Sequence, residues 1–201
     1  MPGSVSLRSY PFHGLRTAAW KSRLWALLAL AVLALPAAAA GRAWILVDTR
    51  TLTLTVYASD HRALARFHNI AIGSGGPAYE HRRGDGTTPL GVYHIAWIDR
   101  HSRFGTFYGL DYPTPAVAGR AYLRGDISAA QYDAIIAAFR AHRIPPQDTP
   151  LGGLLGIHGV GTGDPHIQRD INWTNGCVAL GNRQLRRLAR WLHLGTKVVI
   201  R

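Results

Sequence analysis

The sequence Thr-Asn-Gly-Cys-Val-Ala-Leu at residues 174–180 contains the only cysteine of the chain, Cys177. Nineteen positions earlier, His158 lies in the sequence Gly-Ile-His-Gly at residues 156–159. A thiol is a strong nucleophile only as a thiolate, and a nearby imidazole or another positive charge lowers its pKa from about 8.5. The two stretches therefore favour nucleophilic catalysis by Cys177 with His158 beside it. The alternative for a lone cysteine is an inert core residue.

The residues around this pair predict the rim of a sheet. Residues 154–157 form an apolar, strand-like run that leads into His158, and glycines at positions 159, 161 and 163 predict a loop after it. Residues 174–177 form a polar turn that leads into the apolar residues 178–180. Such a turn can display a nucleophile, although a histidine after a strand is by itself more often structural.

Most of the remaining pattern is typical of β-strands. Strands are predicted at residues 44–47, 51–57, 65–72, 91–98 and 197–200, with a hairpin turn at residues 48–50. Residues 84–91 are glycine-rich but lack the Gly-Lys-Ser/Thr ending of a phosphate loop, which favours a plain loop before the next strand.

Two helices are predicted to pack on these strands. The first covers residues 128–143, begins with a capping box of Ser128 and Gln131, and presents one face made of Tyr132, Ile135, Ile136 and Phe139. The second begins with Asn182 as its N-cap, ends near Gly195, and packs inward through Leu185, Leu188, Ala189 and Leu192.

The first 40 residues have the composition of a secretory signal. Four basic residues and no acidic residue precede an apolar run at residues 24–35, and the alanines at positions 38–40 offer a cleavage site before Gly41. We therefore expect export to the periplasm or cell envelope. An uncleaved N-terminal anchor is the alternative, although residues 24–40 are near the lower limit of about 17 residues for a membrane span.

Charge and cysteine content narrow the class of protein. Of the 23 basic residues, 19 lie after residue 40 together with all 11 acidic residues, so this part has a formal charge of +8. The arginines are scattered, which indicates a general attraction to the cell envelope and not a nucleic-acid site. One cysteine excludes an intramolecular disulfide, and a length of about 160 residues fits one domain.

At the level of motifs, the sequence resembles the L,D-transpeptidase (YkuD-type) catalytic domain family. The family signature is a histidine, some fourteen to seventeen residues, Ser or Thr, any residue, then Gly-Cys and a hydrophobic residue; here fifteen residues separate His158 from Thr174. Residues 84–93 resemble the family element Gly-Asp-Gly-x-Thr-Pro-x-Gly-x-Tyr, and the likeness includes residues 152–159 and runs from about Trp44 to the last strand.

This resemblance implies a mainly β fold with a few helices, a β-sandwich-like L,D-transpeptidase catalytic domain at residues 42–201. It implies that His158 takes the proton of Cys177, which then forms a thioester with a peptidoglycan stem tetrapeptide. We expect the carbonyl of Gly159 to orient His158 and the amides of Gly176 and Cys177 to stabilise the oxyanion.

Three neighbouring residues are also expected at the site. Thr174 is expected to hold the turn or to contact substrate, and a purely structural threonine is equally compatible with the sequence. Asn175 and Trp173 are expected to contact the substrate.

Two departures from the family pattern leave the reaction open. Many members have a histidine and an arginine where this chain has Asn175 and Ala179. Residues 173–182 are nearer the branch with Trp-Thr-x-Gly-Cys-x-Ala-Leu-x-Asn, in which some members resemble hydrolases that detach proteins from peptidoglycan. The alternatives are therefore a transpeptidase, a hydrolase (an L,D-carboxypeptidase, or an enzyme that releases an envelope protein anchored to peptidoglycan), and a catalytically idle cell-wall binding module.

No cofactor and no metal are expected, and the expected partners are peptidoglycan stem peptides. The polar residues that could suggest zinc lack the spacing of a known site: His81, His94, His101, His166, Asp164 and Asp170. Of these, Asp164 and His166 are expected on a loop that walls the cleft. Four residues could bind the carboxylates of a stem peptide, or could be solvated surface: Arg82, Arg83, Tyr108 and Tyr112. A membrane is an expected partner only if the leader is retained.

Overall fold

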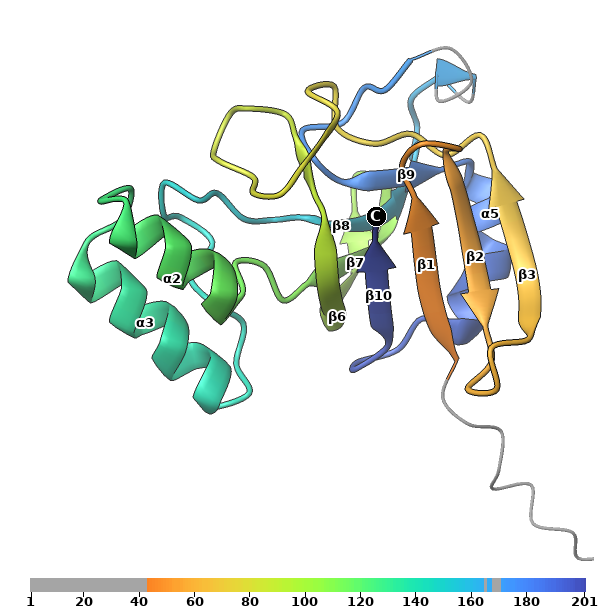
Figure 1. Cartoon of the computed structure of the whole chain (residues 1–201). Helices are drawn as coiled ribbons and strands as arrows, with labels where there is room; N and C mark the ends of the chain where they lie inside the picture. The colour runs from red at the N-terminus through yellow and green to blue at the C-terminus, as the bar shows by residue number, and fades with distance from the viewer. Residues whose placement is uncertain (1–42, 165, 168–170) are drawn as a thin grey trace, which may run out of the picture. The chain divides into compact units, whose positions relative to one another are not determined.

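The computed structural model describes residues 43–164, 166–167 and 171–201 (Figure 1). The leader expected at residues 1–40 and the zinc candidate Asp170 lie outside the described residues. Within the described ranges, no helix combines the length and hydrophobicity needed to cross a membrane.

Strands dominate the described part of the chain, as predicted. Eight of them form a mixed sheet in the order β3-β2-β1-β10-β6-β7-β8-β9, and β4 and β5 form a separate parallel pair. In chain order the strands are β1 (Trp44–Asp48), β2 (Thr53–Tyr57), β3 (Ala63–His68), β4 (Pro77–Ala78), β5 (Thr88–Pro89), β6 (Gly91–Ser102), β7 (Gly105–Leu110), β8 (Gly156–Gly159), β9 (Val178–Leu180) and β10 (Lys197–Ile200).

The long strand β6 joins two halves of this sheet. Its first part pairs with β10 and its second part pairs with β7, with register shifts between Ile95 and Trp97 and between Asp99 and Ser102. Irregularities of this kind bend a strand and allow it to pass from one layer to another. In Figure 1, β7 and β8 accordingly lie behind β6 and β10, and β9 runs across the upper ends of β10 and β1. The expected sandwich-like arrangement is therefore confirmed.

The free edge of β9 is covered by the segment that follows β3. Ala71 and Ala179 form an isolated antiparallel bridge, in which each N–H donates to the other carbonyl, at 2.9 and 2.8 Å. The predicted strand at residues 65–72 is thus shorter than expected and ends at His68, because the chain then leaves β2 to pair with β9. This crossing brings the segment around Gly73 close to Cys177.

Two strands differ from the sequence predictions. The strand expected to precede His158 is β8, which includes His158 itself and pairs with both β7 and β9. Strand β7 was missed, because its sequence Gly-Thr-Phe-Tyr-Gly-Leu contains two glycines, which are rare in strands. Gly109 is required there by packing, since a Cβ at this position would lie 2.0 Å from the ring of Trp97.

Three α-helices are present in the described ranges: α2 (Pro115–Leu123), α3 (Ala129–Arg140) and α5 (Asn182–Leu188), the last followed by the 3₁₀ turn η2 (Ala189–Trp191). Helix α2 was not predicted. Helix α3 has the predicted capping box of Ser128 and Gln131, but Phe139 is largely exposed, because only the face with Ile135 turns inward.

The predicted N-cap role of Asn182 is wrong. Gly181 is the N-cap of α5, and the side chain of Asn182 instead binds the backbone of Gly161: Oδ1 accepts from its N–H at 3.0 Å and Nδ2 donates to its carbonyl at 2.7 Å. Helix α5 therefore fixes the loop that follows His158.

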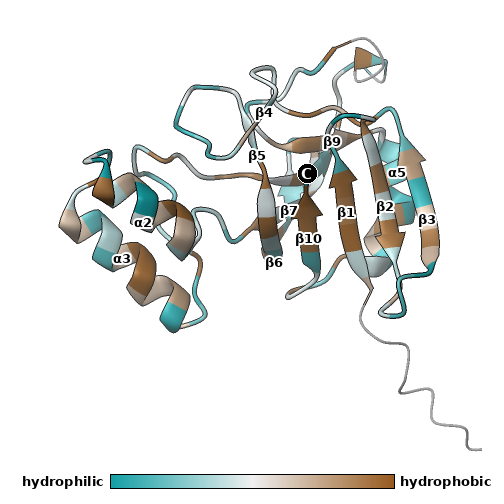
Figure 2. Ribbon diagram, in the orientation of Figure 1, coloured by the Kyte–Doolittle hydropathy of each residue, from teal (hydrophilic) through white to brown (hydrophobic). Residues whose placement is uncertain are grey.

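The main core lies between the inner faces of the sheet and the helices, and Figure 2 shows the hydrophobic character of β1 and β10. Its fully buried side chains include Ile45, Leu54, Ile95, Ile157, Leu180 and Val198. Helices α2 and α3 are only partly apolar, and their outer faces carry hydrophilic residues (Figure 2). This core makes the sheet a rigid support for the residues at its edge.

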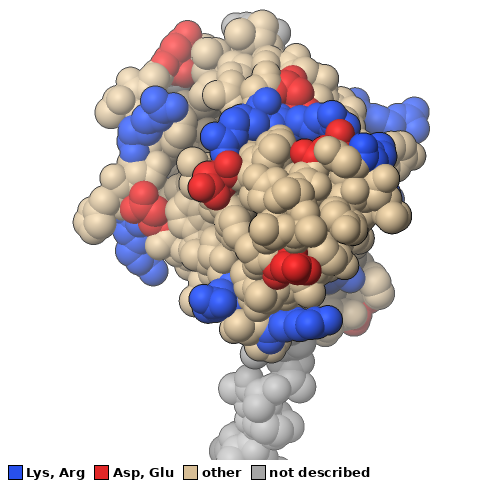
Figure 3. Space-filling model, turned by 90° about the vertical axis from the view of Figure 1, so that its left-hand side faces the viewer, with Lys and Arg blue, Asp and Glu red and all other residues tan. Residues whose placement is uncertain are grey.

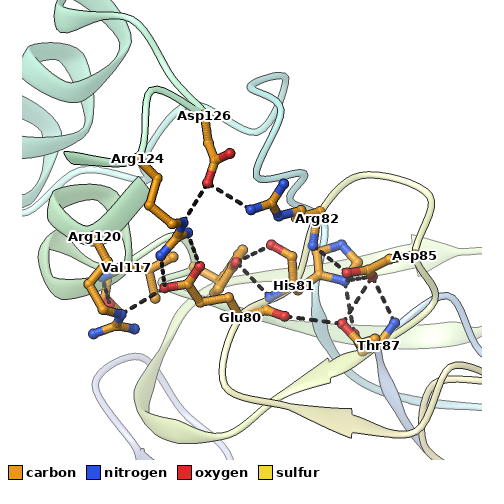
Figure 4. A network of polar contacts seen from close by, with 11 residues as sticks. Glu80, His81, Arg82, Asp85, Thr87, Val117, Arg120, Arg124 and Asp126 are labelled. Atoms are coloured by element: carbon orange, nitrogen blue, oxygen red, sulfur yellow. Dashed lines mark hydrogen bonds and ion pairs between the residues drawn. The ribbon is translucent and has the colours of Figure 1, made fainter. Parts of the chain in front are cut away.

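Helix α2 is attached to the loop after β4 by ion pairs (Figure 4). Glu80 accepts from Arg120 Nε at 2.7 Å and pairs with Arg124, and Asp126 accepts from both Arg124 and Arg82. Although enclosure favours a neutral carboxyl, hydrogen bonds from the two arginines hold the pKa of Glu80 below its usual value. On the side of the molecule shown in Figure 3, basic and acidic side chains are accordingly interspersed.

Loss of the capping box should destabilise the fold measurably. Ser128→Ala leaves the N–H of Gln131 without its side-chain acceptor, which should lower the free energy of unfolding by about 1 kcal/mol. Urea unfolding measures this difference. The control Ser59→Ala, in an exposed turn, should change it by less than about 0.5 kcal/mol, and equal effects of the two substitutions would contradict the assigned role.

Candidate active site

Strands β8 and β9 bring Cys177 and His158 to one face of the sheet. They are parallel, and His158 pairs with Ala179 in the register. Side chains alternate between the faces of a strand, so Cys177, two residues before Ala179, points to the same side as His158. Both residues line one open cleft with a volume of about 1270 Å³.

The turn before Cys177 is held by the hydroxyl of Thr174. This oxygen donates to the carbonyl of Cys177 at 2.7 Å and accepts from the N–H of Gly176 at 3.2 Å. Gly176 has a φ of 121°, which strongly favours glycine, and a Cβ there would lie 2.5 Å from the carbonyl oxygen of Thr87. Of the roles considered for Thr174, the structure therefore shows that of holding the turn.

A buried hydroxyl connects this turn to two other segments. Thr88, fully buried, accepts from the N–H of Gly73 at 2.8 Å and donates to the carbonyl of Gly176 at 2.9 Å. The glycine-rich stretch at residues 84–91 thus begins as a loop, continues into β5, where Thr88 makes this contact, and ends at the start of β6. Gly73 must also be small, because a Cβ there would lie 2.0 Å from the carbonyl oxygen of Gly86.

His158 is enclosed by aromatic rings. It stacks on Phe104 at a centroid distance of 4.1 Å, lies nearly parallel to Phe107 at 5.7 Å, and meets the edge of Trp173 at 5.8 Å. Its Nδ1 lies 2.7 Å from the carbonyl oxygen of Gly159. Because a carbonyl can only accept, Nδ1 carries the proton and Nε2 is the basic nitrogen of the neutral ring.

Burial lowers the pKa of His158, and the positive charge of Arg103 lowers it further, against the opposing hydrogen bond to Gly159. Enclosure by the surrounding protein also raises the pKa of the Cys177 thiol to about 12. The thiol is half-buried and donates a hydrogen bond to the carbonyl of Leu154 at 3.4 Å. The resting site therefore contains a neutral thiol and a neutral imidazole, and not the thiolate considered from the sequence.

Of the other predicted site residues, some line the cleft and others do not. Asn175 is exposed on the cleft, Trp173 contacts His158 and lines the cleft, and Asp164 lines its wall. His166 is exposed, and its N–H donates to Asp164. Among the described residues, no group of three or more metal-ligating side chains is present.

Three of the four candidates for binding a carboxylate do not line the cleft. Tyr108 and Tyr112 are buried in the core, and Arg82 pairs with Asp126. Only Arg83 lines the cleft. Tyr108 lies in β7, which was not predicted, and Tyr112 follows this strand, so no local pattern indicated that their side chains face the core.

The sequence analysis missed two kinds of site residue. One is the aromatic enclosure of His158 by Phe104 and Phe107, which comes from the β6–β7 hairpin, and β7 itself was not predicted. The other is His81, which was considered only as a zinc candidate and which lines the cleft. The pairing of Trp97 with Phe107, at 4.9 Å, extends the aromatic wall.

A comparison with protein families identifies the class to which this fold and cleft belong. The family model of the L,D-transpeptidase catalytic domain, YkuD, matches residues 42–200. The chain belongs to this family. A search of the curated proteins finds no match.

The chain is similar to several solved structures. Pgp2 from Campylobacter jejuni, described as a helical cell shape determining protein, is 20% identical with a TM-score of 0.53, over 79% of this chain and 46% of that chain. Bd1075 from Bdellovibrio bacteriovorus is 19% identical with a TM-score of 0.49, over 81% and 49%. An L,D-transpeptidase from Mycobacterium smegmatis is 13% identical with a TM-score of 0.44, over 80% and 58%. The chain thus spans about half the length of these proteins.

The raised pKa of Cys177 predicts slow alkylation at neutral pH. A thiol with a pKa of about 12 has roughly three orders of magnitude less thiolate at pH 7.5 than one with a pKa of about 8.5. Because Cys177 is the only cysteine, mass spectrometry of the iodoacetamide-treated protein reports on it alone. The rate should still rise between pH 8 and 10, with glutathione as the reference thiol. A plateau below pH 8 would instead indicate a resting thiolate–imidazolium pair.

Removal of the Thr88 hydroxyl should weaken both the fold and the site. Thr88→Val keeps the volume but leaves the N–H of Gly73 and the carbonyl of Gly176 buried without a partner, which should cost about 1–3 kcal/mol. Urea unfolding measures the loss. Thr51→Val, an exposed control whose hydroxyl lies 2.9 Å from that of Thr53, should cost less than about 0.5 kcal/mol, and a similarly small effect at position 88 would refute the bridge.

Proposed function

We propose that the protein is a peptidoglycan L,D-transpeptidase that forms a thioester between Cys177 and a stem tetrapeptide. The observation that carries this proposal is the common orientation of Cys177 and His158 on neighbouring parallel strands, toward one cleft. Membership of the L,D-transpeptidase catalytic domain family supports peptidoglycan stem peptides as the substrate class.

In the first half-reaction, His158 Nε2 takes the proton of the Cys177 thiol while the sulfur attacks a peptide carbonyl. The attacked carbonyl belongs to the third residue of the stem, a diamino acid, and its amide bond joins this residue to the D-alanine at position four. Because both groups are neutral at rest, proton transfer accompanies attack and no ion pair has to be desolvated beforehand. The C–N bond then breaks, the imidazolium of His158 returns its proton to the amine, and D-alanine leaves.

The oxyanion of the tetrahedral intermediate requires N–H donors that are directed into the cleft. The amide of Gly176 already donates to Thr174. The amide of Cys177 has no protein acceptor among the described residues, so it is the better candidate of the two amides expected from the sequence. The turn held by Thr174 fixes its direction.

In the second half-reaction, an amine of a neighbouring stem would resolve the thioester as a 3,3 cross-link. Hydrolysis of the same thioester is the alternative. Residues 173–182 resemble a branch of the family with some hydrolase-like members, so the test below also measures hydrolysis. We also propose that the first 40 residues direct the protein to the periplasm or cell envelope, where peptidoglycan is located. The description of Pgp2 supports a role in cell shape.

Purified tetrapeptide muropeptides test this proposal. The wild-type protein should release D-alanine and form muropeptide dimers, as detected by mass spectrometry. Cys177→Ala should abolish both, because no other thiol can form the thioester. His158→Asn retains a donor for the carbonyl of Gly159 but lacks the base, and should slow D-alanine release by about 10²–10⁴-fold.

The products decide between the alternatives. Tripeptide monomers without dimers would assign a carboxypeptidase activity to the same thioester. Activity that persists in Cys177→Ala would exclude the thioester. Retention on peptidoglycan without any turnover by the wild-type protein would identify a binding module.

A further inference from the structure

His81 is a second imidazole in the wall of the cleft, and the acylation chemistry proposed above does not use it. The residue is 4% exposed and lines the cleft together with Cys177 and His158. Its backbone is fixed by Tyr112: the N–H of His81 lies 3.1 Å from the tyrosine hydroxyl, and this hydroxyl lies 2.5 Å from the carbonyl oxygen of His81.

The ring of His81 has a defined orientation (Figure 4). Nδ1 lies 2.8 Å from the carbonyl oxygen of Thr87 and 2.9 Å from Oδ1 of Asp85. Although enclosure favours a neutral carboxyl, hydrogen bonds from the amides of Thr87 and Arg82 hold the pKa of Asp85 below its usual value, so it is a carboxylate. Both neighbours of Nδ1 can then only accept, which assigns the proton to Nδ1 and the lone pair of the neutral ring to Nε2.

Nε2 of His81 lies at the cleft segment that also contacts the cysteine. A Cβ at Gly152 would lie 2.8 Å from Nε2, and no hydrogen-bond partner for Nε2 is found in the described ranges. Two residues further along, the carbonyl of Leu154 accepts the hydrogen bond of the Cys177 thiol. On the other side, a Cβ at Gly176 would lie 3.2 Å from Nδ1 of His81. The ring therefore lies between the cysteine turn and Gly152, with its basic nitrogen beside the Gly152 segment of the cleft wall.

The two imidazoles differ in the group that orients them. Nδ1 of His158 donates to a neutral carbonyl, whereas Nδ1 of His81 lies beside a carboxylate. A carboxylate stabilises the imidazolium that forms when the ring accepts a proton, so such a pair is suited to act as a general base. His81 can thus act as the base for the second nucleophile, the acceptor that resolves the thioester, whereas His158 acts as the base for the first, the Cys177 thiol.

We propose that His81, oriented by Asp85, is the general base that activates the acceptor of the second half-reaction. This inference rests on the proposed thioester at Cys177. The acceptor, an amine or water, gives its proton to Nε2 of His81 and forms a bond to the thioester carbon. The C–S bond breaks and the sulfur leaves as a thiolate, His81 releases the acceptor's proton to solvent, and the thiolate takes one proton from solvent, which restores the resting thiol.

The variant His81→Asn separates this role from a structural one. The asparagine amide can replace Nδ1–H as the donor to Thr87 and Asp85, but it offers no basic nitrogen at the position of Nε2. A matched control is His94→Asn, because His94 also pairs with an aspartate, Asp111, at 3.1 Å but is exposed and outside the cleft.

Intact-protein mass spectrometry during a single turnover with a tetrapeptide muropeptide follows both half-reactions. In His81→Asn, D-alanine release should stay within about threefold of wild type, while the thioester should decay at least about 10²-fold more slowly and accumulate. His94→Asn should match wild type in both. In His81→Ala, added imidazole should restore the decay rate, which a purely structural role would not allow.

Three outcomes would overturn the inference. A thioester that decays at the wild-type rate in His81→Asn excludes His81 as the base, and equal slowing of both half-reactions assigns it a structural role. Absence of any thioester in the wild-type protein removes the proposed function and this inference together. If thermal unfolding shows that His81→Asn does not fold, His81→Gln is used with the same criteria.

Discussion

One buried hydroxyl connects the three segments on which the site depends. Thr88 accepts from Gly73 and donates to Gly176, so two backbone groups far apart in the sequence satisfy each other through one side chain. An unpaired backbone group in such a buried position costs free energy comparable to a lost hydrogen bond. Glycines at both contacts allow the backbones to approach, and a Cβ at Gly73 would lie only 3.0 Å from the Cα of Gly176. The hydrogen bonds and packing around Thr88 therefore fix the direction of the Cys177 turn, independently of the chemistry of the thiol.

Enclosure by the surrounding protein determines the charge of His158 and Cys177. Aromatic rings around His158 and the protein around Cys177 disfavour the charged form of each, so the two groups are neutral at rest. In the proposed mechanism, charge develops only when substrate is bound and the thiol loses its proton, and donors directed at the carbonyl then stabilise it. In contrast, the carboxylate of Asp85 is surrounded by donors and stays charged. The cleft thus combines an apolar wall at His158 with a polar wall at His81.

Local patterns were sufficient for the strands β1, β2 and β10, for helix α3 and for the motifs around His158 and Cys177. The proximity of that pair follows from the register of β8 with β9, which no local pattern reveals. Sequence patterns also failed to predict elements in which tertiary packing, and not the intrinsic strand or helix propensity of the residues, determines the structure. Strand β7 contains Gly109 because the ring of Trp97 occupies the space that a Cβ would need. The side chain of Asn182 binds the backbone of Gly161 and does not cap its own helix. His81 and Asp85 are four residues apart in the sequence, but only the folded loop turns them toward each other.

Ala179 occupies the position at which many family members have an arginine. Ala179 is fully buried, pairs with Ala71 through both backbone groups, and lies opposite His158 in the register. It is also on the same face of β9 as Cys177, so an arginine there would bring a positive charge toward both reactive side chains. Such a charge would lower the pKa of the thiol, whereas here burial raises it to about 12. In the proposed mechanism, Cys177 is therefore activated by direct proton transfer to His158, and the substrate positions its carbonyl as the proton moves.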